Sequence, residues 1–370
     1  MKIQSINKNI NSLYVHIPFC EHICFYCDFV KVKKPTKNEK VIYDYLDNLE
    51  KELLAYGDRL NHLQTIYIGG GTPSCLDEKQ TIRMCEILNK YVNKCTIEYT
   101  IELNPESVTK EKLLIYKNNN INRLSMGIQT FDNSLLKKVG RIHDNKEAID
   151  AYKLIRQVGF DNVSIDLMYN LFDQEAKNIE TDLNYIKELK PDHISWYSLI
   201  MKEKSIWGKL KYKKPSKDED FDILVNKGLK KLGYVRYEIS NYSLKDEKKS
   251  LHNISYWNSD LFAGVGVGAS GFEIIDNKYY LTCNEGNFLS YKKKYELVSE
   301  NDFYFQVLMM GLRLIGGINL EIEINKYAYK AYEEKINENI NKNFLEVKDN
   351  HLKCTERGLN ILNEILVSLL

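Results

Sequence analysis

The alternation of strand-like and helix-like segments is the feature that most constrains the fold of this 370-residue chain. Short apolar runs rich in β-branched and aromatic residues predict strands, and the longer segments between them repeat with the helical period. Strict alternation of this kind is typical of a parallel sheet with right-handed crossovers. The predicted strands are 12–17, 65–70, 96–103, 123–129, 162–169 and 193–200, and the predicted helices are 39–56, 77–91, 109–118, 144–158 and 175–189.

A sheet of this kind is either open and doubly wound or closed into a complete or partial barrel, and periodicity alone leaves both open. The polar residues at the strand ends favour the barrel. Cysteines follow the first strand and Gly-Gly-Gly-Thr-Pro the second, while Glu102, Gln129 and Asp166 lie in or at the ends of the third, fourth and fifth. Barrel enzymes build their sites from several strands at this carboxyl end. We therefore expect an α/β chain with a barrel-like sheet.

The rest of the chain has a different character, and its length favours a second, smaller unit. A lysine-rich stretch leads into a predicted helix at 217–232, followed by "LHNISYW" and the glycine-punctuated run 261–272. A helix, a hairpin turning at Asp349-Asn350 and an amphipathic closing helix then predict a small winged-helix-like α+β module. The predicted division is 1–205 for the barrel, 206–300 for a connecting region and 301–370 for this C-terminal module.

Charge and cysteine usage bear on partners and compartment. The 52 Lys and Arg residues balance 51 Asp and Glu residues, and no basic recognition helix is evident, so we expect no nucleic-acid partner. The N-terminus lacks the apolar core of a secretory signal, and no stretch is long and apolar enough for a membrane span. Five of the cysteines are dispersed, which is typical of a reduced compartment. These features predict a cytoplasmic protein.

The other three cysteines, Cys20, Cys24 and Cys27, form a C-x3-C-x2-C cluster directly after the first strand. A structural zinc site needs four ligands, commonly including a second cysteine pair, and the sequence has none; His22 lies awkwardly inside the cluster. A cubane iron-sulfur cluster can take three thiolates from one loop and leave its fourth iron open for a substrate or cofactor. The spacing therefore favours an iron-sulfur cluster, with zinc as the alternative.

Several motifs in order carry a family resemblance. The segments "YVHIPFCEHICFYCDF", "IYIGGGTPS", "IELNPE", "RLSMGIQTF", "VGRIHD" and "SIDLMY" resemble the radical S-adenosylmethionine (SAM) superfamily, and their order is similar to its oxygen-independent coproporphyrinogen dehydrogenase branch. The resemblance implies a partial (β/α)6 barrel in which the three cysteines hold a 4Fe-4S cluster and SAM chelates the open iron. One departure is "YNLFDQ" at 169–174, where the family has a Gly-Leu-Pro run.

The resemblance also implies a SAM pocket at the strand ends. Glycines after the second strand allow close backbone approach. By charge complementarity we assign Arg141 to the SAM carboxylate, and the acidic and amide side chains to its hydroxyl or ammonium groups. The residues implied by family position are Tyr14, Tyr26, Gly70, Gly71, Thr72, Glu102, Gln129, Arg141, Asp166 and Ile200.

Two features separate the branches of this family. The dehydrogenase motif carries another cysteine two residues after the third, where this chain has Phe29. The segment "HNISYW" (252–257) is similar to the H-N-x-x-Y-W motif of the HemW heme chaperone family, which implies that His252, Asn253, Tyr256 and Trp257 contact heme, with His252 as a hypothetical iron ligand. On spacing alone a buried packing cluster is favoured for this segment, and the family match reverses that balance.

The sequence as a whole predicts a cytoplasmic heme chaperone that binds a 4Fe-4S cluster, SAM and heme and transfers heme to an acceptor protein. The acceptor is unidentified, and a membrane-associated acceptor and a homodimer are left open. Whether the chain is an enzyme is also left open, and no catalytic residue is assigned. The alternative is an oxygen-independent coproporphyrinogen III dehydrogenase or a related radical SAM oxidoreductase, and a zinc-binding barrel protein is a distant third.

Overall fold

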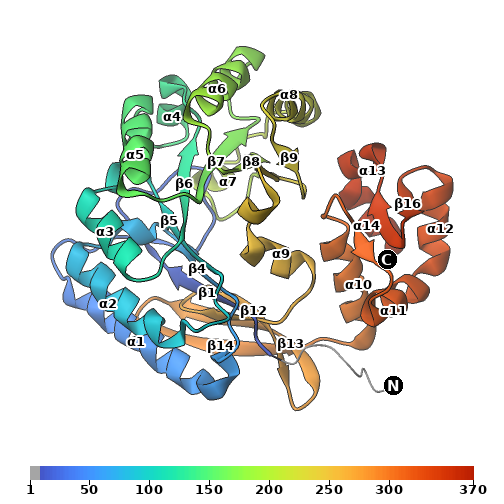
Figure 1. Ribbon diagram of the computed structural model, residues 1–370, viewed down its shortest axis with the longest axis horizontal. Helices are drawn as coiled ribbons and strands as arrows, with labels where there is room; N and C mark the ends of the chain where they lie inside the picture. Colours follow the sequence, from blue (N-terminus) through green and yellow to red (C-terminus); the bar gives the residue numbers. More distant parts are fainter. Residues whose placement is uncertain (1–8) are drawn as a thin grey trace.

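The computed structural model describes residues 9–370. Residues 1–8, which begin the predicted barrel region and form the N-terminus, lie outside the described residues. A twelve-stranded sheet dominates it, in the order β14-β13-β12-β11-β1-β4-β5-β6-β7-β8-β10-β9 (Figure 1). The six consecutive parallel strands in the middle confirm the predicted fold class. They are β1 (Ser12–Ile17), β4 (Thr65–Gly70), β5 (Glu98–Leu103), β6 (Arg123–Gln129), β7 (Val163–Tyr169) and β8 (His193–Ser198).

Helices that follow these strands form the outer layer of the molecule (Figure 1). Local sequence fixes their ends: Asp77 and Asp144 begin two of them with capping boxes, and Gly159 ends one at a φ of +92°. The predicted helices are present within one to three residues at each end. They are α1 (Lys40–Tyr56), α2 (Glu78–Leu88), α3 (Lys110–Asn118), α5 (Asn145–Val158) and α6 (Ala176–Leu189), with the shorter α4 (Asn133–Lys138) and α7 (Ile206–Lys209) in addition.

Residues 206–300 contribute strands to both ends of the same sheet. On one side β11 (Phe262–Val265) pairs in parallel with β1 and continues into the antiparallel strands β12 (Ser270–Ile275), β13 (Lys278–Asn287) and β14 (Ser290–Leu297). On the other side β10 (Asn241–Ser243) and β9 (Val235–Arg236) follow α8 (Asp218–Lys231), the helix predicted at 217–232. The glycine-punctuated run 261–272 forms β11, the turn after it and the start of β12, and a Cβ on Gly264 would lie 2.0 Å from the Ser270 carbonyl oxygen.

The helix α9 (Leu251–Trp257) contains the "HNISYW" segment and lies between the parallel strands and the C-terminal module (Figure 1). The Glu98 carboxylate, which is only 3% exposed, accepts hydrogen bonds from the backbone N–H groups of Leu251 (2.8 Å) and His252 (3.1 Å). A carboxylate at a helix N-terminus satisfies free donors and complements the helix dipole. Glu98 thereby ties α9 to the interior of the sheet.

The C-terminal module is the predicted winged-helix-like α+β unit, and its apolar core also includes Phe272 of β12 and Tyr279 of β13. Asp349 and Asn350 turn its hairpin with φ values of +50° and +58°, as a two-residue hairpin turn requires. No helix in residues 9–370 is long and apolar enough to cross a membrane. The module comprises α10 (Glu300–Gly311), β15 (Ile318–Asn319), α11 (Glu323–Ala331), α12 (Glu333–Asn341), β16 (Leu345–Lys348), β17 (His351–Cys354), α13 (Glu356–Asn360) and α14 (Leu362–Leu369).

Candidate functional site

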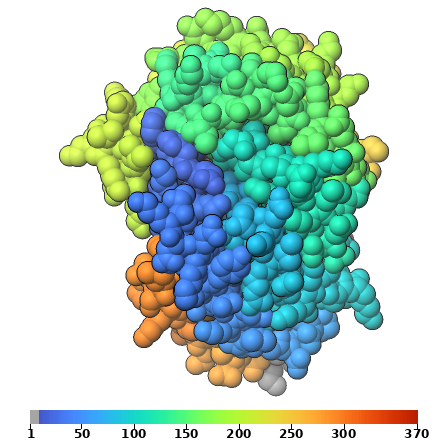
Figure 2. Space-filling view, turned by 90° about the vertical axis from the view of Figure 1, so that its left-hand side faces the viewer, coloured from blue at the N-terminus to red at the C-terminus, as the bar shows by residue number. Residues whose placement is uncertain are grey.

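The three clustered cysteines line one cavity of about 130 Å³, reached from the carboxyl ends of the parallel strands. Their loop begins in β2 (Phe19–Cys20) and leads to β3 (Val32–Lys33), with which β2 pairs in parallel. Figure 2 shows a dark-blue segment from the N-terminal part of the described chain lying beside the yellow-green segment near residue 200. Consistent with this, the Trp207 amide donates to the Phe25 carbonyl at 3.1 Å. The cysteine loop, which follows the first strand of the barrel, therefore also contacts the segment that follows the last strand, β8.

Two glycines after β4 allow the neighbouring turn to press against this loop. A Cβ on Gly71 would lie 2.7 Å from the Phe19 carbonyl oxygen and 2.8 Å from the Cys20 sulfur. Gly70 has a φ of +116°, and its Cβ would lie 2.7 Å from the His16 ring. Side chains larger than hydrogen are excluded at both positions. The glycines thus allow the turn to lie directly against the cysteine loop. The sequence predicts that they allow close approach of the backbone to SAM.

Arg141 brings a positive charge to the sulfurs. Its Nη1 lies 3.5 Å from the Cys24 sulfur, and its Nη2 donates to the Gly127 carbonyl at 2.5 Å. Burial opposes the charged form, but the nearby Cys24 and Tyr26 outweigh it and raise the pKa of Arg141. Burial also raises the pKa of the Cys20 thiol to about 11. A permanent cation at this point favours sulfur in its anionic form.

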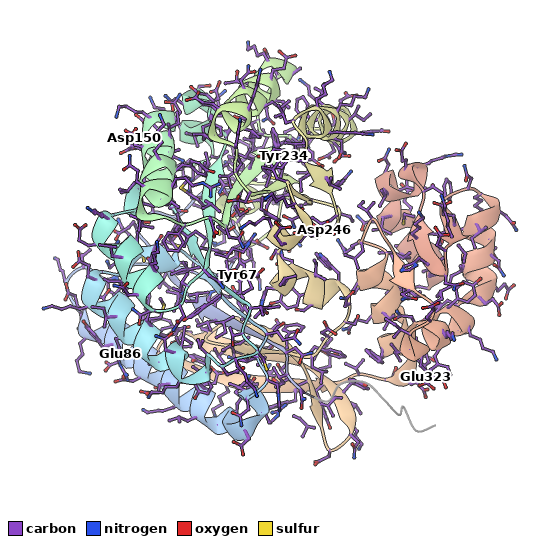
Figure 3. All side chains as sticks on the ribbon, in the orientation of Figure 1. Tyr67, Glu86, Asp150, Tyr234, Asp246 and Glu323 are labelled. Carbon is purple, nitrogen blue, oxygen red and sulfur yellow. The ribbon has the colours of Figure 1, made fainter. Side chains whose placement is uncertain are left out.

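Acceptors for a polar ligand line the same cavity. Glu102 accepts a hydrogen bond from the Tyr67 hydroxyl (2.8 Å) and one from the Gly70 amide (3.2 Å), and burial raises its pKa to about 7. Tyr67 lies in the middle of the molecule, inside the ring of helices (Figure 3). The Ser125 hydroxyl contacts both oxygens of Asp166 (3.0 and 3.1 Å), whose pKa burial also raises. These carboxylates are held by neutral donors inside the barrel.

The residues assigned to SAM from the sequence gather in part. Tyr26, Gly70, Gly71, Thr72, Glu102, Gln129, Arg141 and Asp166 line the cavity of the cysteines. Ile200 lines an adjoining cavity of about 540 Å³ instead. Tyr14 is not among the lining residues of either; its hydroxyl lies 3.1 Å from His16 Nδ1 and its ring stacks on Tyr67. The role of each residue toward SAM stays a prediction.

The donor set of this cavity fits the implied cofactors. It offers three sulfurs, a buried guanidinium and buried carboxyl and amide acceptors, which match an iron-sulfur cluster and a ligand carrying an ammonium, a carboxylate and hydroxyls. Among residues 9–370, no three His, Cys, Asp or Glu side chains are arranged to hold one metal ion. A cubane differs from a single ion in presenting a separate iron to each thiolate.

The residues assigned to heme from the sequence do not share one cavity. His252 is fully buried, with Nδ1 2.7 Å from the Thr65 hydroxyl and Nε2 2.7 Å from the Tyr256 hydroxyl. Its ring stacks on Tyr67 with centroids 5.0 Å apart, and burial lowers its pKa to about 3. Both ring nitrogens of His252 are therefore engaged, so its ligation of heme iron stays a prediction that requires Tyr256 to release Nε2.

The other two residues of the motif face different spaces. Asn253 lines the 540 Å³ cavity beside the cysteines. Trp257 lines a cavity of about 420 Å³ against the C-terminal module, and the Arg313 guanidinium lies 5.4 Å from its ring centroid. The helix α9 consequently separates two cavities, and one heme in either cavity would contact only part of the motif.

The "YNLFDQ" departure has a local explanation. Asn170 adopts a φ of +60°, a conformation that glycine adopts freely and asparagine tolerates. Its amide nitrogen donates to the Pro215 carbonyl (2.9 Å) and to Asp218 (2.8 Å), and its oxygen accepts from the Lys217 amide (3.1 Å). Asn170 therefore retains the turn that a glycine would make and adds contacts to the segment before α8.

Sequence reasoning missed several residues that line these cavities, including Arg123, Ser125 and Tyr197. The signal was available in the strand period, because alternate residues of a strand point to the same face. Arg123, Ser125 and Gly127 alternate along β6, before the β-bulge between Gly127 and Gln129. The Tyr197 hydroxyl donates to the Gln129 side chain at 3.1 Å, a contact between strands that periodicity does not reveal.

Comparisons with known proteins agree with this geometry. The Radical SAM superfamily model matches residues 14–186, and the HemN C-terminal domain model matches residues 298–361. The chain is 34% identical to heme chaperone HemW of Lactococcus lactis, covering 96% of each chain. It is 31% identical to heme chaperone HemW of Bacillus subtilis (96% of this chain, 98% of that one) and 30% identical to that of Escherichia coli (96% and 97%).

A solved structure resembles nearly the whole chain. The coproporphyrinogen III oxidase HemN of Escherichia coli, described as a radical SAM enzyme, superposes with a TM-score of 0.80 over 98% of this chain and 90% of its own. The two sequences are 22% identical. This likeness establishes the common fold of the barrel and the C-terminal module.

Proposed function

This chain belongs to the HemW heme chaperone family of the radical SAM superfamily, and we propose that it is a cytoplasmic heme chaperone that binds a 4Fe-4S cluster, SAM and heme and passes heme to an acceptor protein. The observation that supports the proposal most is the cavity shared by the three cysteines and eight of the residues implied for SAM. The adjoining cavity of about 540 Å³ is of a size that suits a small-molecule ligand.

Cys20, Cys24 and Cys27 would hold the cluster through their sulfurs. When bound, the cluster would supply one open iron for the amino and carboxylate groups of SAM. Arg141, 3.5 Å from the Cys24 sulfur, would stabilise negative charge on the sulfurs and on the SAM carboxylate. Burial of these groups keeps competing water away and strengthens each charge interaction.

Glu102, Gln129 and Asp166 would orient SAM through its ammonium and hydroxyl groups. Their side chains are already positioned by neutral donors, with the Tyr67 hydroxyl on Glu102, the Tyr197 hydroxyl on Gln129 and Ser125 on Asp166. Such positioned acceptors bind a ligand without reorganising first. Glu102, whose pKa burial raises to about 7, would accept from the ammonium more strongly once it is deprotonated.

Phe29 supports a carrier over a dehydrogenase. Its side chain is 63% exposed and lines both cavities, where the dehydrogenase motif carries a thiol. Single exposed apolar side chains are common on protein surfaces, so the support comes from the position of this ring at both cavities. A flat apolar macrocycle is a suitable ligand for such a surface.

An iron measurement tests the cluster. After anaerobic reconstitution with iron and sulfide, the wild type is expected to hold about four irons per chain, as a cubane requires. Cys20→Ser, Cys24→Ser and Cys27→Ser should each lose most of this iron. Cys95→Ser, at a half-buried position outside the loop, is the matched control and should retain it. Equal iron in all four variants would refute the assignment of the cysteines.

A turnover measurement separates the two branches. The reconstituted wild type, supplied with SAM and a reductant, is expected not to convert coproporphyrinogen III to protoporphyrinogen. Sustained conversion would contradict the assignment as a heme chaperone and support the assignment as a dehydrogenase. Cleavage of SAM to 5'-deoxyadenosine without porphyrinogen product is compatible with the chaperone, since a SAM site can react slowly without a dedicated substrate.

A further inference from the structure

Arg123 carries a buried positive charge that no carboxylate neutralises directly. It begins β6, is 2% exposed, and its Nε is buried without a hydrogen-bond partner. No acidic side chain of residues 9–370 makes an ion pair with it. Burying an unpaired guanidinium costs free energy of folding. A bound anion from outside the chain would offset this cost.

The guanidinium lines the 540 Å³ cavity that adjoins the cysteines. Two apolar side chains of the same cavity, Phe29 and Ile200, are 63% and 61% exposed and therefore mark its mouth. Serine hydroxyls of Ser195 and Ser240 line it as well. The cavity thus runs from an apolar, solvent-facing rim to a buried cation, which suits an elongated ligand with an apolar body and an acidic end.

The alternative role for Arg123 is to neutralise the nearby carboxylates of Glu102 and Asp166. Both interact with Arg123 by charge alone, without a direct ion pair. Their oxygens are already taken by neutral donors: Tyr67 and the Gly70 amide for Glu102, and serine hydroxyls for Asp166. Burial also raises the pKa of both carboxyls. Arg123 therefore retains donors for a further acceptor.

We propose that Arg123 anchors a carboxylate of the ligand in this cavity, and that the carboxylate is a propionate of heme whose macrocycle contacts Phe29 and Ile200. The proposal rests on the proposed function. Guanidinium and carboxylate match in a two-pronged, charge-assisted pair, and the burial of Arg123 strengthens it. The SAM carboxylate is the other source of the same chemistry, and Arg141 beside the Cys24 sulfur is the better placed cation for it.

The test compares heme with its dimethyl ester, in which both propionates are neutral. Each is titrated into the reconstituted full-length protein and followed by the Soret band. The wild type is expected to bind heme about ten- to a hundred-fold more tightly than the ester. Arg123→Gln should lose this preference, and Arg123→Lys should retain part of it. Arg156→Gln is the matched control, since Arg156 pairs with Asp192 (2.7 Å) on the outer layer and should retain the full preference.

Three outcomes would overturn the inference. A wild type that binds heme and ester equally needs no carboxylate anchor, a comparison that holds even if Arg123→Gln fails to fold. An Arg123→Gln variant that retains the preference assigns the anchor elsewhere. If Arg123→Gln binds SAM more weakly but still prefers heme over its dimethyl ester, Arg123 binds the SAM carboxylate instead. A wild type that binds no heme at all instead overturns the proposed function, and the two failures are thereby distinguished.

Discussion

At the scale of single residues, the candidate site depends on close contacts that leave no space for a larger side chain. Gly71 is the clearest case, because an added Cβ would overlap the backbone at Phe19 and the Cys20 sulfur. The sequence indicated that glycines were needed after the second strand but not what they approach. That contact joins segments 50 residues apart, and only the folded chain reveals it. His252 was likewise recognisable as a motif residue, while its full burial was not.

Gly71→Ala is expected to lower iron content after reconstitution by at least about half. The methyl group must displace the cysteine loop, because backbone atoms cannot move aside as a flexible side chain can. Iron per chain and the visible spectrum of the cluster provide the measurement. Gly316→Ala is the control, since nothing lies within 4 Å of its added Cβ. An unchanged iron content in Gly71→Ala would show that the loop tolerates the shift.

The hydrogen bond between His252 Nε2 and the Tyr256 hydroxyl gives a second prediction. If His252 ligates heme iron, Tyr256→Phe frees Nε2 and should tighten heme binding by about tenfold, the worth of one buried hydrogen bond. His252→Ala should weaken it. Soret titrations of both variants decide the matter. Unchanged affinity in both would leave His252 as a residue that packs α9 against Thr65 and Tyr67.

At the scale of elements, the alternating strands and helices of the barrel could be predicted, while the strands of residues 206–300 could not. These include β13 and β14, although they have ten and eight residues. The parallel strands and the helices α1 to α3, α5 and α6 follow from periodicity and capping residues. The strands β9 to β11 have four residues or fewer, too short to show a period. The helix α9 was missed because it has only seven residues; Ser250 caps it locally, and the Glu98 carboxylate adds a tertiary contact from inside the sheet.

A buried carboxyl couples α6 to the end of β6 and predicts a pH dependence. Asp182 is fully buried, accepts from the Phe131 amide (2.7 Å) and Thr130, and has its pKa raised by burial to about 7. Because the folded pKa exceeds the unfolded value of about 3.9, the stabilisation is full below about pH 4 and is lost as pH rises through about 7. The wild type should therefore lose on the order of a few kcal/mol relative to Asp182→Asn between these values.

Denaturant unfolding of both proteins from pH 4 to pH 8 provides this measurement. The difference in free energy of unfolding removes the other titrating groups, which both proteins share. The result expected is a difference that moves in favour of Asp182→Asn as pH rises. A difference that is constant with pH would mean that Asp182 remains ionised in its buried position.

At the scale of the whole molecule, the antiparallel end of the sheet and the C-terminal module share one apolar core, which is distinct from the core of the barrel. The Tyr279 ring of β13 stacks on Phe303 of α10 with centroids 4.4 Å apart, and Phe272 of β12 lies 5.6 Å from Phe303. Most buried residues of this core lie within the separate family match at residues 298–361, and Phe272 and Tyr279 of the sheet also belong to it. How the two parts pack could not be predicted, because no periodicity within one part specifies its partner surface.

Phe303→Ala is expected to destabilise the C-terminal module by about 3–5 kcal/mol, the cost of removing a buried aromatic ring. Hydrogen exchange within residues 300–370 should accelerate, while the parallel strands should stay protected. Tyr327→Ala, at a position 39% exposed, is the control and should change little. Uniform acceleration across the chain would show that the barrel and the module unfold as one unit.

Heme titration of the anaerobically reconstituted protein tests the central claim most directly. The account predicts a saturable Soret band with one heme per chain, retained when coproporphyrinogen III is added and accompanied by no porphyrinogen turnover. Absence of saturable heme binding in a protein that holds its cluster would contradict the account, since the cavity beside the cysteines would then have a different ligand.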